Sequence, residues 1–100
     1  MQVALAFERA GAFALLIEMV PGDVARRITA AVSIPTVGIG AGNACDAQVL
    51  VWQDMAGLRS GPLPRFVKQY AEMRKLLGDA AQAFAADVAA GTFPGPEHTF

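Results

Sequence analysis

The sequence contains only one cysteine, Cys45, and one histidine, His98, among its 100 residues. A single cysteine cannot form an internal disulfide, so we expect a reducing, cytoplasmic environment. No cluster of histidine, cysteine, aspartate and glutamate has the spacing of a metal site. No histidine lies near Cys45 to act as its base, which argues against a cysteine nucleophile. For His98 we expect a role in packing or hydrogen bonding.

Charge is also scarce. Charged residues make up 17% of the chain and its net charge is −1, whereas about 25% is usual. This balance gives no basic footprint for nucleic acid and no polybasic patch for a membrane surface. The first residues lack a positively charged region and include Glu8, so we predict no signal peptide. No apolar run reaches the roughly 18 residues of a membrane-spanning helix. We therefore expect no nucleic-acid or membrane partner.

Apolar residues, in contrast, are abundant and make up 54% of the chain. A chain of this length buries only roughly 60–65% of its unfolded surface. We infer that some apolar faces are covered by a partner subunit or by another part of the same domain.

Apolar runs and helical patterns alternate in the first half of the chain. A continuous apolar run such as "AFALLIE" is typical of a strand buried on both faces. Pro21, Gly22 and Asp23 predict a helix start, and Pro35 ends that helix. The expected elements are helices over 1–10 and 23–32 and strands over 12–18, 36–39 and 49–52. Such alternation predicts βα units and a parallel sheet.

The second half has a different pattern. A glycine- and proline-rich loop over 56–64, "AGLRSGPLP", ends at Pro64, which can open a helix. Apolar residues at helical spacing predict a helix over 64–77, a break at Gly78 and a second helix over 79–90, followed by a coil tail. We expect Trp52, Phe66 and Tyr70 in the core. The fold class we expect is α/β. Three parallel strands do not close a sheet, so we expect residues 1–100 to be the last part of a larger α/β domain.

Glu18 is the carboxylate that ends the first predicted strand. Active sites of α/β folds lie at the carboxyl ends of their strands. A carboxylate among apolar side chains is a stronger base, because its charged form is poorly solvated. Glu18 is therefore a candidate general base. The alternative is a structural role, in which Glu18 caps the next helix or pairs with Arg26 or Arg27.

The motif "GIGAG", Gly38 to Gly42, is the second candidate. Its backbone N–H groups could hold an anion. The motif lacks the G-x-G-x-x-G spacing and a helix directly behind it. The alternative is a tight strand exit that needs positive φ. Asp46 and Asp54 follow at the same predicted sheet edge, and we expect them to order loops by accepting backbone hydrogen bonds.

Several motifs together resemble the carboxyl-terminal portion of the ketopantoate hydroxymethyltransferase family. They are "LIEMVP" (Leu16–Pro21, with Ile17 before Glu18), "IPTVGIGAG" (Ile34–Gly42) and "DAQVLVWQD" (Asp46–Asp54). The downstream "PRFVKQYAEM" and the closing "FPGPEHTF" also resemble that family. The resemblance covers nearly the whole chain, with the motifs in the family's order.

The resemblance implies a (β/α)8 TIM barrel that transfers a hydroxymethyl group. The donor is 5,10-methylenetetrahydrofolate, the acceptor is 3-methyl-2-oxobutanoate and the product is 2-dehydropantoate, on the route to pantothenate and coenzyme A. In this family Mg2+ binds the oxo acid and stabilises the enolate. The family's proton acceptor corresponds to Glu18, and Ile39 and Val51 would line the apolar side of the pocket. The family forms large homo-oligomers.

The resemblance also sets a limit. Residues 1–54 correspond to about the last three barrel strands, and residues 55–100 to the C-terminal helices and tail. The family's magnesium ligands and other oxo-acid contacts come from earlier strands, so we expect no metal ligand here and no activity from these residues alone. Earlier βα units in frame upstream of Met1, or a companion chain, would support an enzyme fragment.

Two alternatives remain at this point. A non-catalytic interaction module would form a discrete oligomer without turnover. A phosphate-binding unit built on "GIGAG" would bind nucleotides or sugar phosphates saturably.

Overall fold

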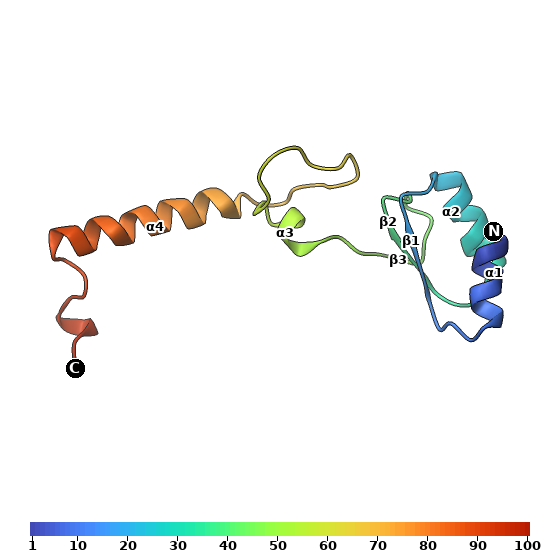
Figure 1. The fold of residues 1–100 in the computed structure, drawn as a ribbon, viewed down its shortest axis with the longest axis horizontal. Helices are drawn as coiled ribbons and strands as arrows, with labels where there is room; N and C mark the ends of the chain where they lie inside the picture. Colours follow the sequence, from blue (N-terminus) through green and yellow to red (C-terminus); the bar gives the residue numbers. More distant parts are fainter.

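A computed structural model describes all residues, 1–100, as an α/β chain with one sheet. Figure 1 shows the helices α1 and α2 beside this sheet and the helix α4 extending away from it. The elements are α1 (Gln2–Arg9), β1 (Leu15–Glu18), α2 (Gly22–Ala31), β2 (Thr36–Ile39), β3 (Ala47–Gln48), α3 (Trp52–Met55), α4 (Met73–Ala90) and a short 3-10 turn, η1 (Pro96–His98).

The sheet has three parallel strands in the order β1-β2-β3. In the register, Leu15 pairs with Thr36 and Glu18 pairs with Ile39, so β1 and β2 end side by side. Helix α2 forms the crossover between them. The βα alternation and the parallel sheet predicted from the apolar runs are therefore confirmed, whereas these residues show no closed barrel.

The core lies on one face of the sheet, where α1 and α2 pack (Figure 1). Leu15 and Ile17 face these helices and are buried, whereas Leu16 on the opposite face is 64% exposed. The prediction of a strand buried on both faces is wrong for these residues, because no element covers the second face. The buried apolar residues are Ala4, Leu15, Ile17, Ala25, Ile28 and Ala41.

Asp46 orders the loop between β2 and β3, as predicted. Its Oδ2 accepts hydrogen bonds from the Thr36 backbone N at 2.8 Å and from Thr36 Oγ1 at 3.1 Å. The edge of the sheet differs from the prediction. The sequence predicts Asp46 at the carboxyl ends of the strands, but its partner Thr36 is the first residue of β2, at the amino end. A parallel β3 must start at the same edge as β2, so the loop crosses the sheet before it reaches Asp46.

Glu8 connects α1 to the turn after α2. Its Oε1 accepts hydrogen bonds from the Ser33 Oγ at 2.5 Å and the Ser33 backbone N at 2.7 Å. These bonds favour the ionised carboxylate and lower the pKa of Glu8, the side-chain bond having the larger effect.

This contact predicts a pH dependence of the packing of α1. A carboxyl group whose pKa is lowered on folding stabilises the folded state above its ordinary pKa of 4.5, and that stabilisation is lost as the pH falls through the lower folded-state pKa. We expect exchange of the Ser33 amide proton to become less protected, relative to its intrinsic rate, as the pH falls below that value. Glu8→Gln should weaken this protection at pH 7 and remove its acid dependence. An unchanged acid dependence in Glu8→Gln would contradict this role.

The third predicted strand, 49–52, is wrong. The sheet bonding ends with Val49, whose backbone N donates to the Gly38 carbonyl oxygen at 2.9 Å. The backbone then closes a helical turn, because Met55 N donates to the Val51 oxygen at 2.9 Å. The apolar run over these residues therefore leads from β3 into α3.

The helix predicted over 64–77 is also wrong in its first part. Tyr70, Met73 and Arg74 donate their backbone N–H groups to the carbonyl oxygens at the end of α3 and just after it, Met55, Ala56 and Gly57. Tyr70 before α4 and the first two residues of α4 thus bond to the end of α3, and no helix forms over 64–72. The predicted break is wrong as well, because α4 continues through Gly78, which keeps its backbone donor.

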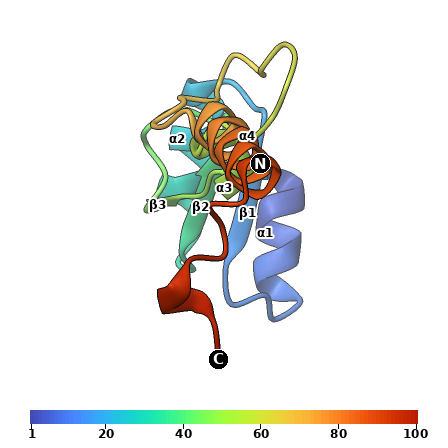
Figure 2. The same ribbon diagram turned by 90° about the vertical axis from the view of Figure 1, so that its left-hand side faces the viewer.

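Helix α4 extends away from the rest of the chain in Figure 1 and is seen nearly end-on in Figure 2. None of its residues is buried. The molecule is elongated, 65 × 32 × 16 Å. At the far end, the Phe93 ring lies 5.5 Å from that of Phe84, and His98 Nδ1 accepts a hydrogen bond from Gly95 N at 3.1 Å. His98 thus has the hydrogen-bonding role predicted for it. No helix is both long and apolar enough to cross a membrane.

Candidate functional site

Glu18 and Ile39 lie next to each other at the carboxyl ends of β1 and β2. The backbone N of the next residue, Met19, donates to the Ile39 oxygen at 2.9 Å. Met19 has a φ of 52°, in the left-handed region that non-glycine residues rarely adopt. The chain therefore turns sharply directly after Glu18 and leaves this carboxylate at the end of the sheet.

The Glu18 side chain is exposed and forms no hydrogen bond or ion pair. It lies on the uncovered face of the sheet, as does Leu16. The structural alternative, an ion pair with Arg26 or Arg27, does not occur. The apolar surroundings predicted from the sequence are present in part, because Glu18 lines a hollow of ≈ 200 Å³ beside α1 whose other nine lining residues are apolar. Glu18 is thus free to accept a proton from a molecule bound at the strand ends.

Glycines form the exit from β2, as the sequence indicated. Gly40 and Gly42 have φ values of 64° and 77°. A Cβ at Gly42 would come within 3.1 Å of Gly22 Cα, so the loop packs closely against the start of α2. Gln48 Nε2 fixes this loop by donating to the Gly42 oxygen at 2.9 Å. The close approach of the "GIGAG" backbone therefore serves packing within the chain.

Ile39 and Val51, the two predicted pocket residues, lie in different parts of the structure. Ile39 is half-buried and on the same sheet face as Glu18, since the two are partners in the register. Val51 is exposed and precedes α3, beyond the end of β3. The structure thus places Ile39 beside Glu18, but neither Ile39 nor Val51 lines a hollow at these strand ends.

Phe66 is a residue of this region that the sequence did not identify. A Cβ at Gly40 would lie 2.8 Å from Phe66 Cδ1 and 3.4 Å from Met19 Cγ, so the ring covers the loop after β2. No local pattern places Phe66 here, because the contact joins segments far apart in the sequence. Phe66 is half-buried, whereas Trp52 and Tyr70 are exposed, so the core prediction is wrong for these two.

Two hollows flank Phe66 and share Gly40 and Phe66 in their walls. The larger, ≈ 670 Å³, also includes Met19, Gly22 and Arg65. The smaller, ≈ 410 Å³, is mostly apolar and includes Met55, Lys68 and Tyr70 in its wall. Both volumes fall within the roughly 300–1,000 Å³ of small-molecule sites. Glu18 lines neither of these hollows but directly precedes Met19, which lines the larger one; Glu18 itself lines a smaller hollow of ≈ 200 Å³ beside α1.

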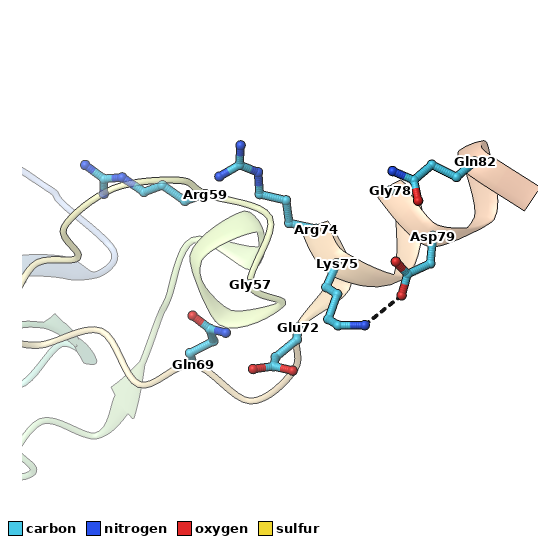
Figure 3. A pocket seen from close by; sticks show the side chains of 9 residues that line it. All are labelled: Gly57, Arg59, Gln69, Glu72, Arg74, Lys75, Gly78, Asp79 and Gln82. Carbon is cyan, nitrogen blue, oxygen red and sulfur yellow. Dashed lines mark hydrogen bonds and ion pairs between the residues drawn. The ribbon is translucent and has the colours of Figure 1, made fainter.

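A third hollow lies away from the strand ends, between α3 and the start of α4 (Figure 3). No apolar residue lines it. Lys75 pairs with Asp79 at 2.8 Å, and Arg59 lies 3.6 Å from the largely buried Asp54. Figure 3 shows Arg59 and Arg74 on the opposite side of the ribbon from Gln69 and Glu72. We interpret this hollow as the solvated junction of two helices.

The side chains of the chain do not form a metal site. No three histidine, cysteine, aspartate or glutamate residues come together as ligands. Cys45 is free and half-buried. The charged side chains at the strand ends are the Glu18 carboxylate and, in the walls of the two hollows, Arg65 and Lys68.

Comparison with known proteins identifies the family. A sequence model of ketopantoate hydroxymethyltransferase matches residues 1–96. The 3-methyl-2-oxobutanoate hydroxymethyltransferase of Nocardioides sp. is 68% identical over 97 residues, which are 97% of this chain and 33% of that relative. The proteins of that name from Frankia casuarinae and Streptomyces coelicolor are 61% and 58% identical over 97% and 96% of this chain, and in each case 33% of the relative.

The chain spans about a third of the length of these curated relatives. The match extends from α1 to η1, and so it includes Glu18 and the strand ends. The chain belongs to the ketopantoate hydroxymethyltransferase family.

Proposed function

We propose that this chain supplies the proton acceptor, Glu18, for hydroxymethyl transfer from 5,10-methylenetetrahydrofolate to 3-methyl-2-oxobutanoate. The observation that carries the proposal is the free Glu18 carboxylate at the carboxyl end of β1, in register with Ile39. Strand ends are where α/β enzymes place their chemistry. Family membership supports the reaction class, because the relatives are named for this transfer.

The reaction requires a base at C3 of the oxo acid. The C3 proton is acidic because the 2-oxo group delocalises the resulting negative charge. Glu18 takes this proton. Water adds to the one-carbon unit and both of its C–N bonds break, which releases tetrahydrofolate and leaves the carbon as formaldehyde. C3 bonds to that carbon, and its oxygen takes up a proton to become the hydroxyl group. The product is 2-dehydropantoate. A carboxylate without a competing ion pair, as Glu18 is here, is suited to this proton transfer.

We propose further that the sheet belongs to a (β/α)8 barrel whose other strands come from residues outside this chain. The free edge of β1 supports this. Met1, Val3, Phe7 and Leu16 form an apolar hollow of ≈ 200 Å³ between α1 and that edge. An exposed apolar strand edge favours pairing with a further strand.

The magnesium ion that the family resemblance implies does not fit the residues of this chain, because no ligand cluster is present. We propose that its ligands lie outside these residues, and we assign it no step here. When bound, such an ion would act as a Lewis acid on the oxo acid.

The alternative function is an interaction module without turnover. Four apolar residues of α4 favour it, because each is more than half exposed, Phe84 in spite of its contact with the Phe93 ring: Leu76, Leu77, Phe84 and Val88. The same residues support assembly with further copies, as expected from the family. The two functions differ in one outcome: only the first predicts that this chain sustains the chemical step.

A chimera tests the proposed function. The whole chain replaces the aligned third of the Nocardioides relative, and 2-dehydropantoate formation is measured from the two substrates. We expect turnover comparable to that of the unmodified relative. A folded chimera of the same oligomeric state without turnover would contradict the proposed function and favour the interaction module.

A further inference from the structure

The segment over 65–68 presents two positive charges and an aromatic ring at the strand ends. Arg65 lines the hollow beside Met19, Lys68 lines the hollow beside Tyr70, and Phe66 forms the wall between them. Neither cation takes part in an ion pair or a side-chain hydrogen bond. Arg59 and Lys75, in comparison, pair with Asp54 and Asp79. The free positive charge of this region therefore lies on either side of Phe66.

The position of Phe66 relative to the sheet is well defined. Its ring covers Gly40, where a Cβ would come within 2.8 Å of it. Any larger residue at position 40 would displace the ring. Lys68 is held as well, because its Nζ lies 4.8 Å from the centre of the Tyr70 ring. The segment thus offers a fixed apolar surface with a cation at each side.

These features match a ligand that combines a flat ring with carboxylates. The folate co-substrate has this chemistry, because its aminobenzoyl ring carries a glutamate with two carboxylates. The oxo acid has a carboxylate but no ring. We propose that the segment over 65–68 recognises the tail of the folate, an inference that rests on the proposed function: Phe66 packs against the aminobenzoyl ring, and Arg65 and Lys68 bind the glutamate carboxylates.

The test removes the two charges in the chimera described above. Arg65→Ala with Lys68→Ala should raise KM for 5,10-methylenetetrahydrofolate by about tenfold or more, since each loses a charge-assisted hydrogen bond. KM for 3-methyl-2-oxobutanoate and kcat should change little. The variant should also lose its preference for this donor over 5,10-methylenetetrahydropteroate, which lacks the glutamate. Arg65→Lys with Lys68→Arg, which keeps both charges, should retain that preference.

The matched control is Arg26→Ala with Arg27→Ala, which removes the same charge from two exposed positions on α2. KM for the folate should not change in this control. An unchanged preference for the glutamate-bearing donor in the Arg65 and Lys68 double variant would overturn the inference. So would an equal rise in KM in the control, because it would show a non-specific effect of net charge.

Failure of the proposed function is distinguishable from failure of this inference. If the folded chimera gives no turnover, equilibrium dialysis with tetrahydrofolate and tetrahydropteroate measures recognition of the tail directly. Tighter binding of tetrahydrofolate that disappears in the double variant supports the inference without catalysis. Equal binding of the two compounds, or no binding of either, overturns it.

Discussion

Glu18→Gln in the chimera is expected to lower the rate of 2-dehydropantoate formation by about 10²–10⁴-fold, the usual contribution of a general base. Glutamine keeps the size and polarity of the side chain but cannot accept the proton. The fold should not change, because Glu18 is exposed and forms no hydrogen bond or ion pair that the substitution would break. The measurement is kcat with both substrates saturating, with circular dichroism and sedimentation to confirm the folded state.

Glu72→Gln is the control for this prediction. Glu72 is an exposed glutamate directly before α4, and its side chain has no ion pair. The chemical change is identical, but it lies away from the strand ends, so kcat should stay within about twofold. A Glu18→Gln chimera that keeps more than about a tenth of the rate would contradict the assignment of the base, since such a small loss is below that of a general base.

Gly57→Ala is expected to open the junction between α3 and the segment that leads into α4. Gly57 has a φ of 74°, and a Cβ there would lie 2.0 Å from the Ala71 carbonyl oxygen. The backbone conformation alone costs about 1–2 kcal/mol in a residue with a Cβ, and the contact with a backbone atom adds to this. We expect local destabilisation of more than about 2 kcal/mol, equivalent to about a 30-fold change in an opening equilibrium.

Amide hydrogen exchange on the chain measures this opening. The backbone N–H groups of Tyr70, Met73 and Arg74 donate across the junction and should lose protection. The Met19 N–H, which bonds to Ile39 at the sheet, serves as the internal reference and should not change. Normal protection of the three junction amides in Gly57→Ala would contradict the structure of this region.

Gly78→Ala is the matched substitution. Gly78 lies inside α4, and nothing lies within 4 Å of a Cβ built there. Alanine should therefore strengthen the helix by about 1 kcal/mol. Opposite effects of the same change at two glycines would show that the geometry at Gly57, rather than the loss of glycine itself, controls the junction.

The sequence predicts β1, β2 and the carboxyl ends of these two strands better than it predicts the segments that follow the sheet. Apolar runs next to Glu18 and Ile39 are local signals, and both strands and their parallel pairing follow from them. The helix predicted from Pro64 is wrong because the backbone donors at Tyr70 and Met73 bond to α3. Helical periodicity in the side chains carries no information on where a distant backbone acceptor lies.

In the candidate site, too, residues with a local sequence signal are predicted, and residues placed by contacts between distant segments are not. Glu18 is predicted as the base from its place at the end of an apolar run, and the structure places it at the carboxyl end of β1; its role stays a prediction. Phe66 is not found, because its contact with Gly40 depends on how the segment after α3 folds back to the strand ends. The apolar surroundings expected for Glu18 are found only in part: Glu18 lines an apolar hollow beside α1, but the sheet face that bears it has no covering layer within these residues.

The central claim is that Glu18 removes the C3 proton of the oxo acid, and isotope exchange tests it most directly. The chimera is incubated with 3-methyl-2-oxobutanoate in deuterium oxide without folate, and loss of the C3 proton signal is followed by NMR. We predict exchange by the chimera that falls by at least about 100-fold in Glu18→Gln and is unchanged in Glu72→Gln. Equal exchange rates in the parent chimera and Glu18→Gln would show that another group is the base.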